Sequence, residues 1–89
     1  MQFEWDHKKA ISNLRKHKIS FEEAMTVFYD PLSATFEDPN HSIDEKRLIT
    51  VGYSSRSRLL VVSHTERGKT IRIINARTAT ANERKRHEN

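Results

Sequence analysis

The stretch between residues 59 and 77 constrains the fold more than any other part of the chain. Two runs rich in apolar and β-branched residues, 59–65 and 70–77, flank the dipeptide Arg67-Gly68. Glycine tolerates the positive φ that tight hairpin turns require, so this pattern predicts two antiparallel strands joined at Arg67-Gly68. Cationic and imidazole side chains interrupt both strands. A core does not need such charges, and we therefore expect them to serve a function.

Length and composition limit what this hairpin can belong to. The chain has 89 residues, 35% of them hydrophobic, which predicts a single domain over residues 1–89 with a modest core and no deep cavity. It contains no cysteine, which excludes disulfides, thiol nucleophiles and cysteine-containing zinc sites and favours an intracellular protein. There is no apolar run of about 18 residues, and the N-terminus is acidic where a signal peptide is basic. The sequence therefore predicts a cytoplasmic protein.

Charge is distributed unevenly along the chain. Residues 1–19 carry five Lys or Arg and two Asp or Glu. Residues 20–45 carry no Lys or Arg and seven Asp or Glu, whereas residues 46–89 carry eleven Lys or Arg and three Asp or Glu. The net charge of the chain is +4. The basic second half predicts a polyanionic partner such as nucleic acid, although solubility alone also favours charged surfaces. The acidic middle is either a surface for a basic partner or a solvated helix and loop.

Local signals predict two helices in the first half of the chain. The predicted elements are a strand over residues 2–5, a helix over 6–17, and a second helix that starts after 20 and ends at 30. Asp6 is placed as the N-cap of the first helix, and Ser20 with Glu23 forms a capping box for the second. Asp30-Pro31 ends that helix, because the residue before a proline is pushed out of the α region.

The second half reads as strands followed by a helix. Strands are predicted over residues 33–36, 45–53, 59–65 and 70–77, with turns at 38–42 and 54–57. Thr80 and Glu83 form another capping box, which opens a short helix with a cationic end that suits the helix dipole. The predicted fold class is therefore α+β: a short N-terminal strand, two helices, an antiparallel four-stranded meander and a C-terminal helix.

The predicted pairing divides the ionisable side chains between two faces of the sheet. With symmetric turns, Arg47 lies beside His64 on a mostly apolar face, while Arg72 lies near Lys46 on the other. A slip of one residue would exchange these faces. We expect the two early helices to cover the apolar face, which leaves the other face for the C-terminal helix and a ligand.

Several segments, in their order and spacing, resemble the BrnT family over essentially the whole chain. They are FEWD at 3–6, NLRKH at 13–17, SFEEA at 20–24, DP at 30–31, LLVVSHTER at 59–67, IRIINAR at 71–77 and the pair Glu83-Arg84. BrnT proteins are toxins of type II toxin-antitoxin pairs, with a RelE-like fold and ribonuclease activity, and a DNA-binding antitoxin called BrnA neutralises them. The resemblance implies a RelE-like RNase that forms a hetero-oligomer with an antitoxin, and an antitoxin that carries the complex to operator DNA.

Two positions depart from the pattern of that family. Lys18 stands where a glycine is expected after the first helix, and lysine pays a penalty in the left-handed conformation that glycine avoids. His87 stands where a tyrosine is expected near the end of the last helix. A histidine there is able to stack on a base or to transfer protons.

RNA cleavage by attack of the 2′-hydroxyl on its own phosphate needs a base, positive charge for the transition state and an acid. It demands no metal. His64 is the first candidate for proton transfer because imidazole titrates near neutral pH, and Glu66 is the alternative. Arginine keeps its proton, so Arg47, Arg72 and Arg77 are predicted to be catalytic as phosphate clamps and transition-state stabilisers.

Further cations are predicted to bind the RNA backbone or to be merely solvated. These are Lys46, Arg56, Arg58, Arg67 and Lys69. His7, His17 and His41 lack the spacing of a metal site, so neither a metal nor another cofactor is expected. The main hypothesis is an RNA endonuclease toxin, and the alternative is a non-catalytic module that binds nucleic acid or a partner protein.

Overall fold

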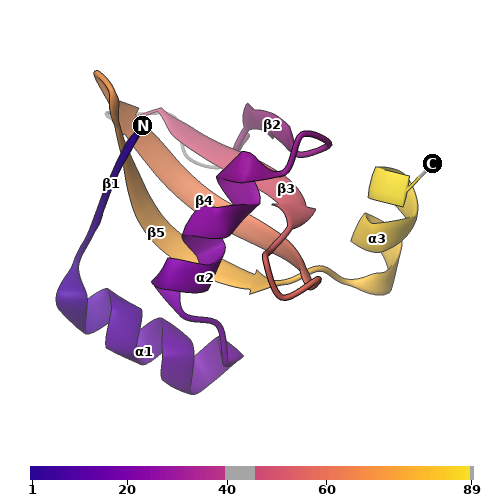
Figure 1. The fold of residues 1–89 in the computed structure, drawn as a ribbon, viewed down its shortest axis with the longest axis horizontal. Coiled ribbons are helices and arrows are strands. Elements are labelled where there is room, and N and C mark those ends of the chain that lie inside the picture. The colour runs from indigo at the N-terminus through magenta and orange to yellow at the C-terminus, as the bar shows by residue number, and fades with distance from the viewer. Residues whose placement is uncertain (40–45, 89) are drawn as a thin grey trace.

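The computed structural model describes residues 1–39 and 46–88. These residues form an α+β fold with three α-helices, one 3-10 helix and five strands (Figure 1). In chain order the elements are β1 (Gln2–Trp5), α1 (His7–His17), α2 (Phe21–Thr26), the 3-10 helix η1 (Val27–Tyr29), β2 (Ala34–Glu37), β3 (Arg47–Tyr53), β4 (Leu59–Arg67), β5 (Thr70–Thr78) and α3 (Ala81–Glu88). The predicted order of elements is confirmed. His41, Glu45 and part of the turn predicted at 38–42 lie outside the described residues.

The sheet is mixed and has five strands, in the order β1-β5-β4-β3-β2. Strands β2 to β5 pair antiparallel with their neighbours in sequence, as the predicted meander requires. The N-terminal strand adds a parallel partner for β5, with Gln2 opposite Thr70 and Trp5 opposite Ile73. The strand over residues 2–5 was predicted, but no local pattern predicts its pairing with β5, because that partner lies near the other end of the sequence.

Side-chain caps fix where the first two helices begin. The Asp6 carboxylate accepts hydrogen bonds from the backbone amides of Lys8 at 2.8 Å and Lys9 at 3.2 Å. The Ser20 hydroxyl accepts one from the Glu23 amide at 3.0 Å. Both N-caps are as predicted, since each satisfies amides that have no partner inside the helix. The return half of the Ser20–Glu23 capping box is wrong, because the Glu23 carboxylate binds the side chains of Ser54 and Arg58 in the β3–β4 turn instead.

Helix α1 ends at Lys18, which adopts the left-handed conformation with φ of 61° and bonds its amide to the Leu14 carbonyl. A side chain with a Cβ is strained there by about 1 kcal/mol. We predict that Lys18→Gly raises the free energy of unfolding by up to about 1 kcal/mol, measured as the urea midpoint. Lys18→Ala is the control, because it removes the charge and keeps the Cβ. An equal gain in both variants would assign the effect to charge.

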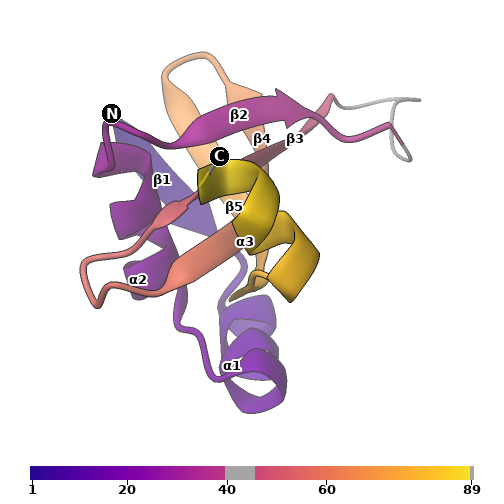
Figure 2. The same cartoon turned by 90° about the vertical axis from the view of Figure 1, so that its right-hand side faces the viewer.

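The two faces of the sheet are covered differently. Helix α2 and η1 pack on one face of the sheet. Helix α1, which comes directly after β1 in the chain, contacts β5, and α3 lies apart from the other helices (Figures 1 and 2). The core under α2 consists of Ile19, Phe21, Ala24, Val27, Leu60, Val62, Ile73 and Ala76. A smaller cluster of Val51, Leu59 and Val61 lies on the opposite face, with Ala79 and Tyr53 packed against it. We call the face that α2 does not cover the open face.

The predicted register between β3 and β4 is wrong by one residue. Arg47 lies opposite Thr65, and His64 lies opposite Leu48. The connection from Ser54 to Arg58 has five residues rather than the four predicted, and it includes Ser57 with φ of 61°. One added loop residue turns every side chain of β3 to the other face relative to β4. Arg47 therefore shares the open face with Arg72 rather than the covered face with His64.

A β-bulge changes the facing of β5. Ser63 lies opposite Asn75 and His64 lies opposite Ile73, so Ile74 is an extra residue in β5. Before the bulge Arg72 points to the open face, and after it Asn75 and Arg77 do. In an uninterrupted strand, residues 72 and 77 would point to opposite faces because side chains alternate. The bulge thus brings Arg72 and Arg77 to one side of the sheet.

Candidate nucleic-acid interface

A row of polar side chains crosses the open face of the sheet. Arg47 of β3, Thr65 of β4 and Arg72 of β5 are directly paired across the strands, and Glu4 of β1 follows Arg72. The two arginines are two strands apart, or about 10 Å between backbones. Arg72 donates to the Glu4 carboxylate at 2.6 Å. Within residues 1–39 and 46–88, the buried Thr65 hydroxyl between the arginines has no hydrogen-bond partner.

Two hollows lie along this face. The first, of about 430 Å³, is lined by α1 and the sheet through Lys9, Ser12, Asn13, Lys16, His17, Asp38, Arg47, Ser63, Ile74 and Asn75. We call it the α1 groove. The second, of about 540 Å³, lies under α3 and is lined by Leu32, Ala34, Phe36, Ile49, Val51, Val61, Arg77, Glu83, Arg86 and His87. We call it the α3 groove. The first is mainly polar and basic, whereas the second has an apolar floor and a charged rim.

Arg77 is held at the start of α3 by a bidentate ion pair. Its two terminal nitrogens donate to the two Glu83 carboxylate oxygens at 2.8 and 2.9 Å. Glu83 also accepts from the Thr80 amide at 2.8 Å, and its own amide donates to the Thr80 hydroxyl, so both halves of the predicted capping box form. The Arg77 guanidinium, followed by Thr80, lowers the pKa of Glu83 to about 2. Arg77 therefore positions α3 as well as facing the groove.

His64 is placed away from the arginines. It has no exposed surface and lies on the face covered by α2 and η1, with its ring edge-on to Phe28 at 4.8 Å between centroids. Its Nε2 is 2.8 Å from the Thr50 hydroxyl, which is 2.7 Å from the hydroxyl of Thr35. Burial lowers the pKa of His64 to about 4. The expectation that His64 lies beside Arg47 is wrong, and its imidazole does not reach the open face.

The depressed pKa of His64 makes stability depend on pH. The unfolded state takes up a proton as the pH falls below the ordinary value of 6.5, whereas the folded state does so only near 4. The free energy of unfolding is therefore expected to fall by about 2 kcal/mol between pH 7 and pH 5 through this group. His64→Gln, whose terminal amide reaches the position of Nε2 beside Thr50, should lose that part of the slope in urea titrations at the two pH values. If the free energy of unfolding falls equally with pH in the variant and the wild type, His64 is not the group responsible.

The cations predicted to bind RNA are in different environments. Lys46 pairs with Glu37 at 2.7 Å on an exposed surface. Arg58 is bound to the Glu23 carboxylate, to which Nε donates at 2.9 Å, so it stabilises the β3–β4 turn. Arg56, Arg67 and Lys69 are exposed in or beside the two hairpin turns, as is Glu66 at the end of β4. The second hairpin turn is Gly68-Lys69, with Gly68 at φ of 59°, so the turn predicted at Arg67-Gly68 is wrong by one residue.

Some residues of this interface were not identified from the sequence. Ser63 and Asn75 lie opposite each other and line the α1 groove. Lys9 and Lys16 line the same groove, although neither was among the residues predicted for the site. The spacing of seven residues, two helical turns, placed both lysines on one stripe. No sequence signal placed that stripe beside β5.

The described residues lack two kinds of feature. Among residues 1–39 and 46–88 there is no helix with the length and apolarity of a membrane span. The same residues contain no cluster of three His, Asp or Glu side chains arranged to hold a metal ion.

The chain is similar in sequence and in structure to proteins of one known family. No curated protein matches the sequence. The structure is similar to the 1.1 Å crystal structure of the Brucella abortus ribonuclease toxin BrnT, with a TM-score of 0.69 and 20% identity, covering 90% of this chain and 97% of that chain. At this identity the likeness shows the fold alone. Residues 5–83 match the family described as the ribonuclease toxin BrnT of type II toxin-antitoxin systems, which implies an antitoxin partner. The chain therefore belongs to the BrnT family of ribonuclease toxins.

Proposed function

We propose that the open face binds single-stranded RNA and cleaves it by attack of a 2′-hydroxyl on the adjacent phosphate. The observation that carries this proposal is the row Arg47–Thr65–Arg72, which aligns two guanidinium groups on a face that also carries both grooves. Guanidinium groups match phosphate oxygens with paired donors and stay charged at any working pH.

In this proposal the arginines supply electrostatic stabilisation. Charge builds on the phosphate oxygens as the 2′-oxygen attacks, and fixed donors aimed at those oxygens lower the barrier. Arg72 and Arg47 hold the reacting phosphate, while Arg77 binds a neighbouring one at the rim of the α3 groove. Glu4, bonded to Arg72, is the carboxylate in the row and is proposed to accept the 2′-hydroxyl proton. As the 2′-oxygen bonds to phosphorus, the bond from phosphorus to the 5′-oxygen breaks, and the departing 5′-oxygen takes a proton from water. His64 contributes by packing.

The test is cleavage of a labelled single-stranded RNA by the purified chain in the presence of EDTA. We expect a shortened product with a 2′,3′-cyclic phosphate end, and we expect growth arrest when the chain is expressed without its antitoxin. An analogue with deoxyribose at the scissile position should stay intact. If the RNA stays intact under all conditions, the proposal that the chain is an enzyme is wrong. If the RNA is cleaved without EDTA but not with it, the proposal that cleavage is independent of metal is wrong.

A non-catalytic binding module is the second candidate. The burial of His64 favours it, because this removes the titratable group best suited to proton transfer from the open face. Under this alternative, RNA binds with an affinity that depends on salt and is recovered intact. The cleavage assay therefore separates the two functions directly.

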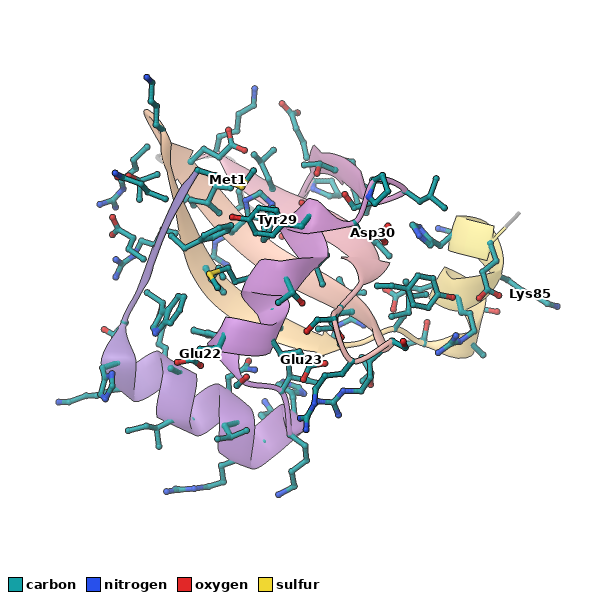
Figure 3. All side chains as sticks on the ribbon, viewed as in Figure 1. Met1, Glu22, Glu23, Tyr29, Asp30 and Lys85 are labelled. Atoms are coloured by element: carbon teal, nitrogen blue, oxygen red, sulfur yellow. The ribbon has the colours of Figure 1, made fainter. Side chains whose placement is uncertain are left out.

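The antitoxin partner is proposed to dock in part on the acidic middle segment and to carry a hetero-oligomeric complex to operator DNA. Only some of the acidic side chains there are accessible. Glu23 is buried against Arg58, and Asp30 accepts from the amides of Leu32 and Tyr53. Glu22 is exposed and points to the opposite side of α2 from Glu23 (Figure 3). We also propose that the fold is RelE-like, as the sequence resemblance implies.

A further inference from the structure

The α1 groove brings cations from two elements together. Lys9 and Lys16 come from α1, and Arg47 comes from β3 on the other side of the groove. His17 adds an imidazole at the end of α1, and Asp38 is the acidic residue of the lining. The groove therefore carries an excess of positive charge, which favours an anionic occupant.

The arginines of this protein differ in whether they have an internal counter-ion. Arg58, Arg72 and Arg77 are each paired with a glutamate. In the part of the chain that the structure describes, neither Arg47 nor Lys16 forms an ion pair, although Arg47 is partly buried. A partly buried cation without a counter-ion is costly to hold in a folded protein. An anion bound in the groove would remove that cost.

The position of α1 against the sheet is fixed by a buried amide. The Asn13 side chain donates to the carbonyls of Ile19 and Ala76, both at 2.9 Å, and accepts from the Ala76 amide at 3.1 Å. All of these bonds are buried, so the helix cannot roll without breaking them. The stripe with Lys9 and Lys16 is thereby held beside β5, whereas Lys8 and Arg15 do not line the groove.

We propose that the α1 groove is a binding subsite for the phosphodiester backbone of single-stranded RNA, flanking the phosphate that is cut at Arg72. This inference rests on the proposed function and extends the site to α1. A strand whose reacting phosphate is held by Arg72 and Arg47, on backbones about 10 Å apart, continues past Arg47 to Lys16 and Lys9. Ser63 and Asn75 line the path and offer hydrogen bonds to sugar hydroxyls or base edges.

A protein segment fits this groove less well than RNA does. Ile74 is the apolar residue of the lining, whereas protein–protein interfaces have apolar centres. The α3 groove, with Phe36 and Leu32, has the apolar surface that the α1 groove lacks. We therefore assign the α1 groove to RNA rather than to the antitoxin.

The test compares two double variants of one helix. Lys9→Gln with Lys16→Gln removes the groove cations, and Lys8→Gln with Arg15→Gln removes the same charge from α1 outside the groove. Glutamine keeps a high helix propensity in both. Binding of an RNA made non-cleavable by deoxyribose at the scissile position alone is measured by fluorescence anisotropy over a range of salt concentrations. Cleavage of the matching RNA gives kcat and KM.

We expect the groove variant to bind RNA more weakly, on the order of tenfold, with a salt slope lower by about 1.4 because two phosphate contacts are lost. Its KM should rise while kcat stays within about twofold, since these contacts hold substrate and transition state alike. The outside variant should match the wild type. Equal losses in both variants would overturn the inference, as would unchanged affinity in the groove variant or a loss confined to antitoxin binding. A wild type that binds RNA without cutting it would reject the proposed catalysis, while the binding comparison would still decide the subsite.

Discussion

Arg72→Ala is expected to lower kcat for RNA cleavage by about 10²- to 10³-fold, the usual loss when one donor to a developing oxyanion is removed. Arg72 is about one-third exposed, with 32% of its side-chain surface accessible, so its guanidinium has access to a bound phosphate while Glu4 orients it. The measurement is single-turnover cleavage of a labelled RNA. Arg47→Ala should have a similar effect, because it occupies the other end of the row.

The control for this prediction is Arg56→Ala, which removes the same charge from an exposed turn. It should leave kcat within about twofold, since contacts of this kind affect encounter more than chemistry. Thermal unfolding of each variant separates lost catalysis from lost fold. If Arg72→Ala and Arg56→Ala cleave RNA equally well, the row is not the catalytic centre. Arg72→Lys should recover only part of the rate, because an ammonium group cannot bind a phosphate through two parallel donors.

Glu23→Ala is expected to cost about 3 kcal/mol of the free energy of unfolding, near the lower end of the range for breaking a buried ion pair. The Glu23 side chain is 4% exposed and that of Arg58 is 35% exposed, and solvent at Arg58 moderates the loss. The Glu23 carboxylate also accepts from the Ser54 hydroxyl at 2.7 Å, so its removal leaves two groups without their partner. The hydrogen bond from Arg58 is the main reason why the pKa of Glu23 lies below its ordinary value.

Urea unfolding of Glu22→Ala provides the matched control. Glu22 precedes Glu23 in the same helical turn and is exposed (Figure 3), so its replacement should change stability by less than about 0.5 kcal/mol. The double variant Glu23→Ala with Arg58→Ala should be less destabilised than the sum of the single variants, because the cation left unpaired is then also removed. Strict additivity would show that the pair does not act as a unit. Antitoxin docking should be probed at Glu22, since a Glu23 variant confounds docking with folding.

The elements that the sequence predicted correctly are those with local causes. Asp6 and Ser20 cap their helices through amides two or three residues away, and Thr80 with Glu83 does the same for α3. Lys18 shows its left-handed strain at the position where the family pattern suggests a glycine. Such features depend on contacts within a few residues, so the sequence alone contains the interacting groups.

The candidate site was only partly predictable, because it depends on contacts between residues that are distant in the sequence. Whether Arg47 meets His64 or Arg72 depends on one extra residue in the β3–β4 loop. Whether Arg77 faces the same side as Arg72 depends on the bulge at Ile74. Side chains alternate every residue along a strand, so a shift of one residue reverses every assignment. The burial of His64 does not depend on that register, because His64 lies on the face that the helices were predicted to cover.

The sequence by itself determined the caps, the order of the elements, the β4–β5 hairpin and a set of arginines suited to phosphate. The tertiary structure decided which of these arginines act together. It placed Arg47 and Arg72 in one row, gave Arg58 to Glu23, and held Lys9 and Lys16 beside the sheet through Asn13. The physical reason is one of range: a cap or a turn acts over a few residues, whereas strand register, bulges and buried polar bonds join residues that are distant in sequence.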